Sequence, residues 1–280
     1  MTEAAPPRRL PAWLWPVLLV GVLALALLLE GAVPDDLLRV SNPDRSAAVG
    51  FGEALDAVDA DGMVLVAMDP DLGTYPEIRA TVRAALDQLR GRGARIGLVS
   101  YTPEGRAVAA AELERLRAAG ASDDRLADFG FLAGAEAALV LSVTDLAPAE
   151  GRSLPASFAT AGDGIAAFDL VLVVGGVDIG PRTWVEQVST RIPELPIVAV
   201  VPTFMQPEVA PYLRTGQLDG LIATVRDGSA YAEGSAHGAA ATSPLAMLVG
   251  LLIALAFVGR ALWTFSRDDA GGTDLPEGLA

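Results

Sequence analysis

Residues 63–100 read MVLVAMDPDLGTYPEIRATVRAALDQLRGRGARIGLVS, and this stretch decides the fold. It begins and ends with an apolar run of strand length. Between the two runs, Thr74 and Glu77 have the spacing of a helix capping box, in which the Thr hydroxyl caps the helix and the Glu side chain reaches back. Gly91 and Gly93 predict the end of that helix. A strand, a helix and a second strand predict a right-handed βαβ unit with parallel strands.

The same alternation of apolar runs and helical segments continues along the chain. Thr102 followed by Pro103 predicts the next helix, because Thr caps a helix and Pro fits its first turn. The apolar runs lack polar alternation, which is typical of parallel strands buried on both faces. We therefore predict an α/β fold, a flavodoxin- or Rossmann-like parallel sheet of about five strands with helices on both faces. We place the later strands at residues 169–174, 197–201 and 218–225, the later helices at 103–120, 133–143, 181–192 and 207–215, and loops before residue 133 and at 145–167.

Two uncharged apolar segments flank this domain. Residues 10–29 and residues 238–259 contain no charged side chain. At 1.5 Å per residue, a helix of about 20 residues spans roughly 30 Å, the thickness of the hydrocarbon layer of a bilayer. The sequence thus predicts one transmembrane helix at each end, with the α/β domain at residues 30–237 and terminal segments at 1–9 and 260–280.

Arginines set the orientation of the predicted spans. Arg8 and Arg9 precede the first segment, and Arg260 and Arg267 follow the second. Because basic residues stay on the cytoplasmic side, we expect a two-pass protein of the cell membrane, with both termini cytoplasmic and the domain extracytoplasmic. The alternative is that the first segment is a cleaved signal peptide, but Glu30 disrupts the small-residue cleavage site that cleavage requires.

Residue counts exclude several classes of chemistry. The chain has no Cys, which removes disulfides, thiolate catalysis and Cys-based zinc sites. The single His, His237, argues against a His-based zinc site or a serine triad. All 20 basic residues are Arg. The absence of Lys rules out a Walker-type phosphate loop and a Schiff-base lysine.

The domain between the apolar segments is strongly acidic. Residues 35–243 contain 16 Arg and 29 Asp or Glu, a net charge of −13. Such a surface repels nucleic acid and anionic headgroups. We therefore expect no nucleic acid as a partner. The predicted transmembrane helices make the lipid bilayer and other membrane or extracytoplasmic proteins the expected partners.

Candidate site residues follow from the fold, because ligands of parallel sheets bind at the carboxyl ends of the strands. Polar residues and glycines stand at these predicted ends. For Gly175 and Gly176, a tight βα turn is an alternative explanation. The ligand-binding candidates are Asp69, Asp71, Thr74, Ser100, Thr102, Gly175, Gly176, Asp178 and Thr203.

Asp69 and Asp71 are the foremost candidates, because two carboxylates one residue apart can share Mg²⁺ or Ca²⁺, with Asp178 as a third ligand. Their DxD pattern resembles that of haloacid-dehalogenase-type phosphatases, which implies a nucleophile at Asp69 and an acid/base at Asp71. Ser100 resembles the second motif of that family. The chain departs from the family in having no Lys, and in placing Thr74 three residues after Asp71 rather than two. The other interpretation of Asp-Pro-Asp-Leu-Gly is a turn without a cofactor.

Four stretches resemble a family of uncharacterised prokaryotic two-pass membrane proteins with an extracytoplasmic α/β domain. The resemblance implies the two-helix architecture and no activity. We accordingly expect a membrane-anchored binding or interaction domain, part of a larger assembly, rather than an enzyme. The alternative function is a divalent-metal-dependent, phosphatase-like hydrolase that uses Asp69 and Asp71. The matching stretches are MDPDLGTYPE, DFGFLAGAEAAL, WVEQVSTRIPELPIVAVV and RTGQLDGLIATVRDGSAYAE.

Overall fold

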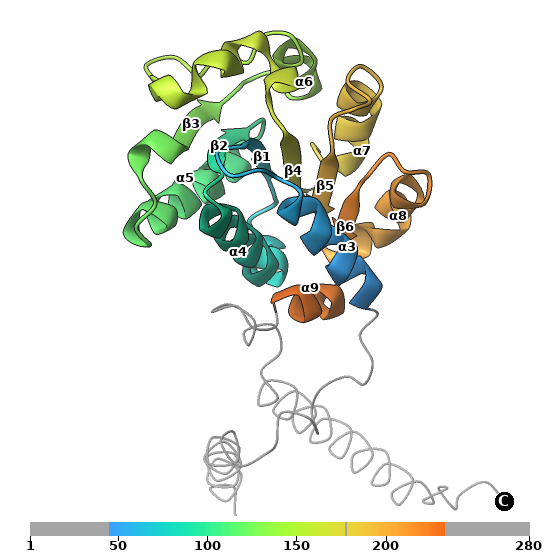
Figure 1. Cartoon of the computed structure of the whole chain (residues 1–280). Helices are drawn as coiled ribbons and strands as arrows, with labels where there is room; N and C mark the ends of the chain where they lie inside the picture. The colour runs from blue at the N-terminus through green and yellow to red at the C-terminus, as the bar shows by residue number, and fades with distance from the viewer. Residues whose placement is uncertain (1–44, 177, 233–280) are drawn as a thin grey trace, which may run out of the picture. The chain divides into compact units, whose positions relative to one another are not determined.

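The computed structural model describes residues 45–176 and 178–232 (Figure 1). Both predicted membrane segments lie outside these ranges. In the part of the chain that is described, no helix is both long enough and apolar enough to cross a membrane. The described residues belong to one compact unit, Ser41–Ala241.

A six-stranded parallel sheet forms the centre of this unit, in the order β3-β2-β1-β4-β5-β6. The predicted α/β class and the parallel sheet are confirmed. The order is that of Rossmann-type sheets, in which the first strand lies in the middle and the chain winds outward in both directions. The strands are β1 (Met63–Asp69), β2 (Arg95–Ser100), β3 (Leu126–Phe131), β4 (Leu170–Gly175), β5 (Ile197–Val200) and β6 (Gly220–Ile222).

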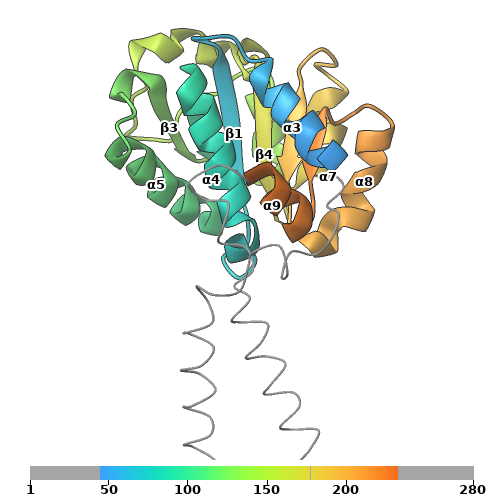
Figure 2. The same ribbon diagram turned by 60° about the horizontal axis from the view of Figure 1, so that its bottom comes forward.

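Helices cover both faces of the sheet. Figure 2 shows α3, α4, α5 and α9 in front of the strands. α7 and α8 cover the opposite face of the sheet, where Trp184 and Val209 enter the hydrophobic cluster. Short 3₁₀ turns are η1 (Asp123–Arg125), η2 (Ala156–Asp163), η3 (Ile165–Ala167) and η5 (Thr203–Met205), and η4 (Val185–Ser189) is a π-helical turn. The helices are α3 (Arg45–Asp56), α4 (Tyr75–Arg92), α5 (Pro103–Ala118), α6 (Glu136–Ser142), α7 (Pro181–Trp184), α8 (Gln206–Arg214) and α9 (Val225–Ala232).

Alternate side chains of β1 enter two separate hydrophobic clusters. Leu65 packs in the cluster beneath η2, α6, α7 and α8. Val66 packs in the cluster beneath α3, α4 and α5. All seven residues of β1 are buried. This double burial is the physical reason for the continuous apolar run in the sequence.

The prediction of about five strands was wrong, because β3 lies in a segment that the sequence analysis assigned to a loop. Its sequence, LADFGF, is interrupted by a charged residue and a glycine. Asp128 pairs with Arg106 of α5 and with Arg152, and Gly130 has a φ of +84° that L side chains rarely adopt. As an edge strand, β3 needs no continuous apolar run, so the pattern of the central strands does not apply to it.

Residues 145–167 form no long regular element, but they are packed rather than free. Phe158 and Ile165 of this segment are fully buried beneath the sheet. The ring of Phe158 meets the ring of Phe129 from β3 edge-on at 6.5 Å. The segment therefore completes the core on one face instead of acting as a flap.

Candidate functional site

The site lies where the chain changes its winding direction. β1 pairs with β2 on one side and with β4 on the other. The chain leaves β1 toward β2 and leaves β4 toward β5, so the loops after β1 and β4 diverge and open a crevice between them. In sheets of this class, ligands bind at this switch point, outside the carboxyl ends of the strands.

Asp69, the last residue of β1, is held asymmetrically at the base of this crevice. Its Oδ1 atom accepts hydrogen bonds from the backbone N–H of Tyr101 at 2.7 Å, the backbone N–H of Thr102 at 2.8 Å and the Thr102 hydroxyl at 3.0 Å. Its Oδ2 atom is buried and has no partner among the described residues. A buried oxygen without a partner costs free energy, which a ligand that donates a hydrogen bond would recover.

Burial governs the protonation of this carboxyl group. Asp69 is only 3% exposed. The loss of hydration raises its pKa to about 7, although the hydrogen bonds from Tyr101 and Thr102 act in the opposite direction. A carboxyl group with such a pKa exchanges its proton near neutral pH, and a cation placed beside it would favour the ionised form.

A cavity of about 350 Å³ opens at this point, and we call it the switch-point cavity. Four of its lining side chains carry carboxyl groups, and none is basic. Its residues follow three neighbouring strands, β1, β2 and β4. They are Asp69, Pro70, Asp71, Leu72, Thr102, Glu104 and Asp178.

Two glycines allow the surrounding backbone to approach this closely. A Cβ atom on Gly105 of α5 would lie 2.1 Å from the carbonyl oxygen of Met68. A Cβ atom on Gly176 would lie 2.8 Å from the carbonyl oxygen of Asp69 and 2.8 Å from Oδ2 of Asp71. Gly176 therefore brings the loop after β4 against the acidic loop after β1, which is a structural role rather than direct ligand contact.

The loop after β1 enters α4 without the predicted capping box. Thr74 has helical backbone angles and no side-chain capping bond, and its hydroxyl instead donates to the carbonyl oxygen of Asp71 at 3.3 Å. Glu77 reaches across the crevice rather than back to Thr74. Its Oε1 accepts the backbone N–H of Thr203 at 2.8 Å and the Thr203 hydroxyl at 2.5 Å. This pair ties the loop after β5 to α4.

The cap of α5 is confirmed. The Thr102 hydroxyl accepts the backbone N–H of Gly105 at 3.1 Å while it donates to Asp69. One side chain thus starts the helix and orients the carboxyl group of the site.

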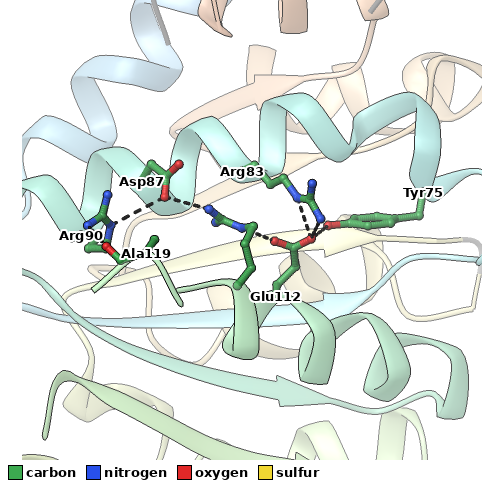
Figure 3. Close-up of polar contacts among 7 residues, drawn as sticks. Tyr75, Arg83, Asp87, Arg90, Glu112 and Ala119 are labelled. Atoms are coloured by element: carbon green, nitrogen blue, oxygen red, sulfur yellow. Dashed lines mark hydrogen bonds and ion pairs between the residues drawn. The ribbon is translucent and has the colours of Figure 1, made fainter. Parts of the chain in front are cut away.

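A buried polar network fixes the start of α4 against α5 (Figure 3). Glu112 is 1% exposed, and its carboxylate accepts the Tyr75 hydroxyl at 2.9 Å, Nε of Arg83 at 2.8 Å and Nε of Arg115 at 2.6 Å. Burial raises the pKa of Glu112, but the hydrogen bonds from the two arginines and Tyr75 outweigh it, so that the net pKa is lowered. Because the backbone N–H of Tyr75 also donates to the backbone carbonyl oxygen of Asp71 at 2.9 Å, this network holds the acidic loop.

The predicted site residues fall into two groups. Asp69, Asp71, Thr102 and Asp178 are brought together around the switch-point cavity. The other five candidates do not line it. Ser100 is fully buried, and its hydroxyl has no partner among the described residues. Thr74, Thr203 and Gly176 have the positions described above, and Gly175 packs close to Pro181.

The sequence analysis missed Glu104. This residue is exposed in the first turn of α5, two residues after the capping Thr. Its position after β2 was visible in the sequence, but its closeness to Asp69 depends on β1 and β2 being neighbours. An acidic residue in a first helical turn also has an ordinary explanation in the helix dipole.

Within the described ranges, no three or more His, Cys, Asp or Glu side chains form a group able to hold a metal ion. Comparisons with protein-family models, with curated proteins and with solved structures gave no match to this chain. The resemblance to two-pass membrane proteins therefore stays a prediction. What the fold and the cavity define is a class: an α/β domain with an acidic crevice at the switch point of a parallel sheet.

Proposed function

We propose that this chain is a membrane-tethered ligand-binding protein whose α/β domain, outside the cytoplasm, takes a ligand in the switch-point cavity. The observation that carries the proposal is the buried Oδ2 of Asp69, which has no partner among the described residues and belongs to a residue that lines that cavity. Native proteins satisfy nearly all such atoms. A carboxyl group in a cleft whose pKa is strongly raised, as at Asp69, is also typical of a functional site.

The two ends of the described domain support the tethering. α3 and α9 pack against each other, with the rings of Phe51 and Tyr231 5.0 Å apart. In both views the beginning of α3 and the end of α9 lie on the same side of the domain (Figures 1 and 2). A domain anchored by segments at both ends needs exits on one side, and the arginines that flank residues 10–29 and 238–259 predict the orientation.

Binding is better supported than the alternative of phosphatase-like hydrolysis. Asp69 and Asp71 do share one cavity, as that alternative requires. A phosphoryl group entering the cavity would meet four carboxyl groups and no basic lining residue. Ser100, the counterpart of the second phosphatase motif, is buried and does not line the cavity.

Thermal melting of the purified full-length chain tests whether the cavity binds a ligand. The probes are MgCl₂, CaCl₂, inorganic phosphate, glutamate and 1,4-diaminobutane. A ligand at a hundredfold excess over Kd stabilises by about 2.7 kcal/mol, so the melting temperature should rise by roughly 5 °C with at least one probe. Asp71→Asn should abolish the rise, and Asp163→Asn, an exposed position outside the cavity, should retain it. No shift with any of the five probes would contradict the proposal.

A further inference from the structure

The charges around the switch-point cavity are unbalanced. Its four carboxyl groups come from three parts of the chain: Asp69 ends β1 and Asp71 follows it, Glu104 is in the first turn of α5 after β2, and Asp178 follows β4. Asp71 is half-buried, whereas Glu104 and Asp178 are exposed. Because no basic side chain is among the described residues of the lining, a positively charged ligand would meet no competing cation there.

Two arginines of the adjacent helices α5 and α7 pair with carboxylates outside the cavity. Arg106 of α5 makes two hydrogen bonds of 3.0 Å with the carboxylate of Asp128. Arg182 of α7 pairs with Glu186 at 2.9 Å. These two guanidinium groups are therefore neutralised by carboxylates of the protein itself. The positive charge in the cavity would come from a ligand.

We infer that the ligand of this cavity is an organic dication, an alkyl diamine with an ammonium group at each end and no carboxylate. This inference rests on the proposed function. One ammonium group is held at Asp69, whose Oδ2 has no partner among the described residues, and the other lies along the part of the cavity that Asp71, Glu104 and Asp178 line.

Size and lining distinguish this ligand from a metal ion. A cavity of about 350 Å³ has the volume of a small-molecule site and far exceeds that of a single ion. Pro70 and Leu72 contribute apolar surface beside the carboxylates, and Leu72 is 56% exposed. A methylene chain covers such surface, whereas a hydrated ion leaves it in contact with water.

The same charges specify what the cavity rejects. An amino acid would bring a carboxylate into a lining that offers it no arginine. Desolvation and repulsion of that group disfavour binding, so selectivity against zwitterions follows from the acidic lining itself. A monoamine leaves part of the acidic lining without a counter-charge.

Isothermal titration calorimetry on the purified full-length chain tests the inference with four matched probes. They are 1,4-diaminobutane, 1-aminobutane, 4-aminobutanoate and MgCl₂. We expect the diamine to bind at least tenfold more tightly than the monoamine, and we expect no binding of 4-aminobutanoate. Asp71→Asn and Asp178→Asn should each weaken diamine binding at least tenfold, while Asp163→Asn should leave it unchanged. Melting curves without ligand establish that each variant is folded.

The outcomes separate the inference from the proposed function. Binding of MgCl₂ without binding of the diamine would overturn the inference of an organic dication, whereas the proposed function as a ligand-binding protein would stand. Equal affinity for the diamine and 1-aminobutane would overturn it in the same way. A fifth probe, acetyl-Lys-Lys-amide, carries two ammonium groups on a peptide. If it binds and the diamine does not, the occupant is a basic segment of a partner protein, and the free-diamine inference fails. If none of these probes binds, the inference fails. The proposed function fails as well if CaCl₂, inorganic phosphate and glutamate also leave the melting temperature unchanged.

Discussion

At the scale of single residues, Asp69 makes the stability of the domain depend on pH. Its pKa of about 7 in the folded state lies above the ordinary value of 3.8. At pH values between 3.8 and about 7, the Asp69 carboxyl group is protonated in the folded state and ionised in the unfolded state. The unfolding free energy therefore decreases as pH rises through this window, by on the order of 4 kcal/mol for this group.

Denaturant titrations of the wild type and Asp69→Asn at pH 4, 5, 6, 7 and 8 measure this contribution. Subtracting the variant from the wild type removes the effects of all other carboxyl groups. The difference in unfolding free energy should be largest at pH 4 and should decline steadily to pH 7. A difference that stays constant across this range would show that Asp69 has an ordinary pKa.

Gly105 offers a second test at this scale. Its replacement by Ala would force a Cβ atom to 2.1 Å from the carbonyl oxygen of Met68 and 2.8 Å from Oγ1 of Thr102. Backbone atoms cannot move aside cheaply, so we expect Gly105→Ala to lower the unfolding free energy by about 2 kcal/mol or more. The matched control is Gly91→Ala in α4, where nothing lies within 4 Å and the change should stabilise by about 0.5–1 kcal/mol. Equal effects of the two substitutions would contradict the close packing of α5 on β1.

At the scale of secondary-structure elements, Glu112 joins α4 to α5. Glu112→Ala would leave Arg83 and Arg115 without their buried carboxylate, and we expect a loss of about 3–5 kcal/mol in unfolding free energy. Tyr75→Phe removes a single hydrogen bond and should cost about 1 kcal/mol. Glu114→Gln, on the same helix with a side chain 74% exposed, should change stability by less than about 0.5 kcal/mol.

Hydrogen exchange separates a local effect of this network from a global one. Since the backbone N–H of Tyr75 donates to Asp71, Tyr75→Phe should speed the exchange of amides 71–75 more than that of the strand amides. Uniform acceleration throughout the domain would mean that the network stabilises the fold without holding the loop of the cavity.

The elements that could be predicted from the sequence are those whose patterns have local causes. β1, β2, β4 and β5 are continuous apolar runs because both faces of the sheet are covered. Asp69 was identified because it follows such a run. β3 was missed because Asp128 and Gly130 interrupt its apolar pattern. Both residues are explained by tertiary contacts at the edge of the sheet and not by the strand itself. The capping box failed for a similar reason, since Glu77 finds its partner in Thr203, far along the chain.

The asymmetry of the Asp69 carboxylate could not be predicted either. It depends on the loop after β2 lying beside β1, which supplies three donors to Oδ1 and none to Oδ2. Strand order is a property of long-range pairing, and one sequence does not contain it in any local pattern. The residue types of the site were therefore predictable, and its chemistry was not.

At the scale of the whole molecule, the predicted orientation in a membrane determines which compartment would supply a ligand of the switch-point cavity. The expected arrangement follows from Arg8, Arg9, Arg260 and Arg267, which flank the two apolar segments on their terminal sides. The chain contains no Cys, so a single introduced Cys is a specific reporter. Glu150→Cys places it at an exposed position of the domain, and Asp274→Cys places it in the C-terminal segment.

Labelling of these two variants with a membrane-impermeant maleimide tests the orientation in intact cells. If the domain faces outward as predicted, Glu150→Cys reacts without permeabilisation, and Asp274→Cys reacts only after the membrane is opened. Reaction of both positions in intact cells would mean that the C-terminal segment is also outside. Protection of both would place the domain in the cytoplasm, so that a diamine from the cytoplasm, rather than from outside, would have access to the switch-point cavity.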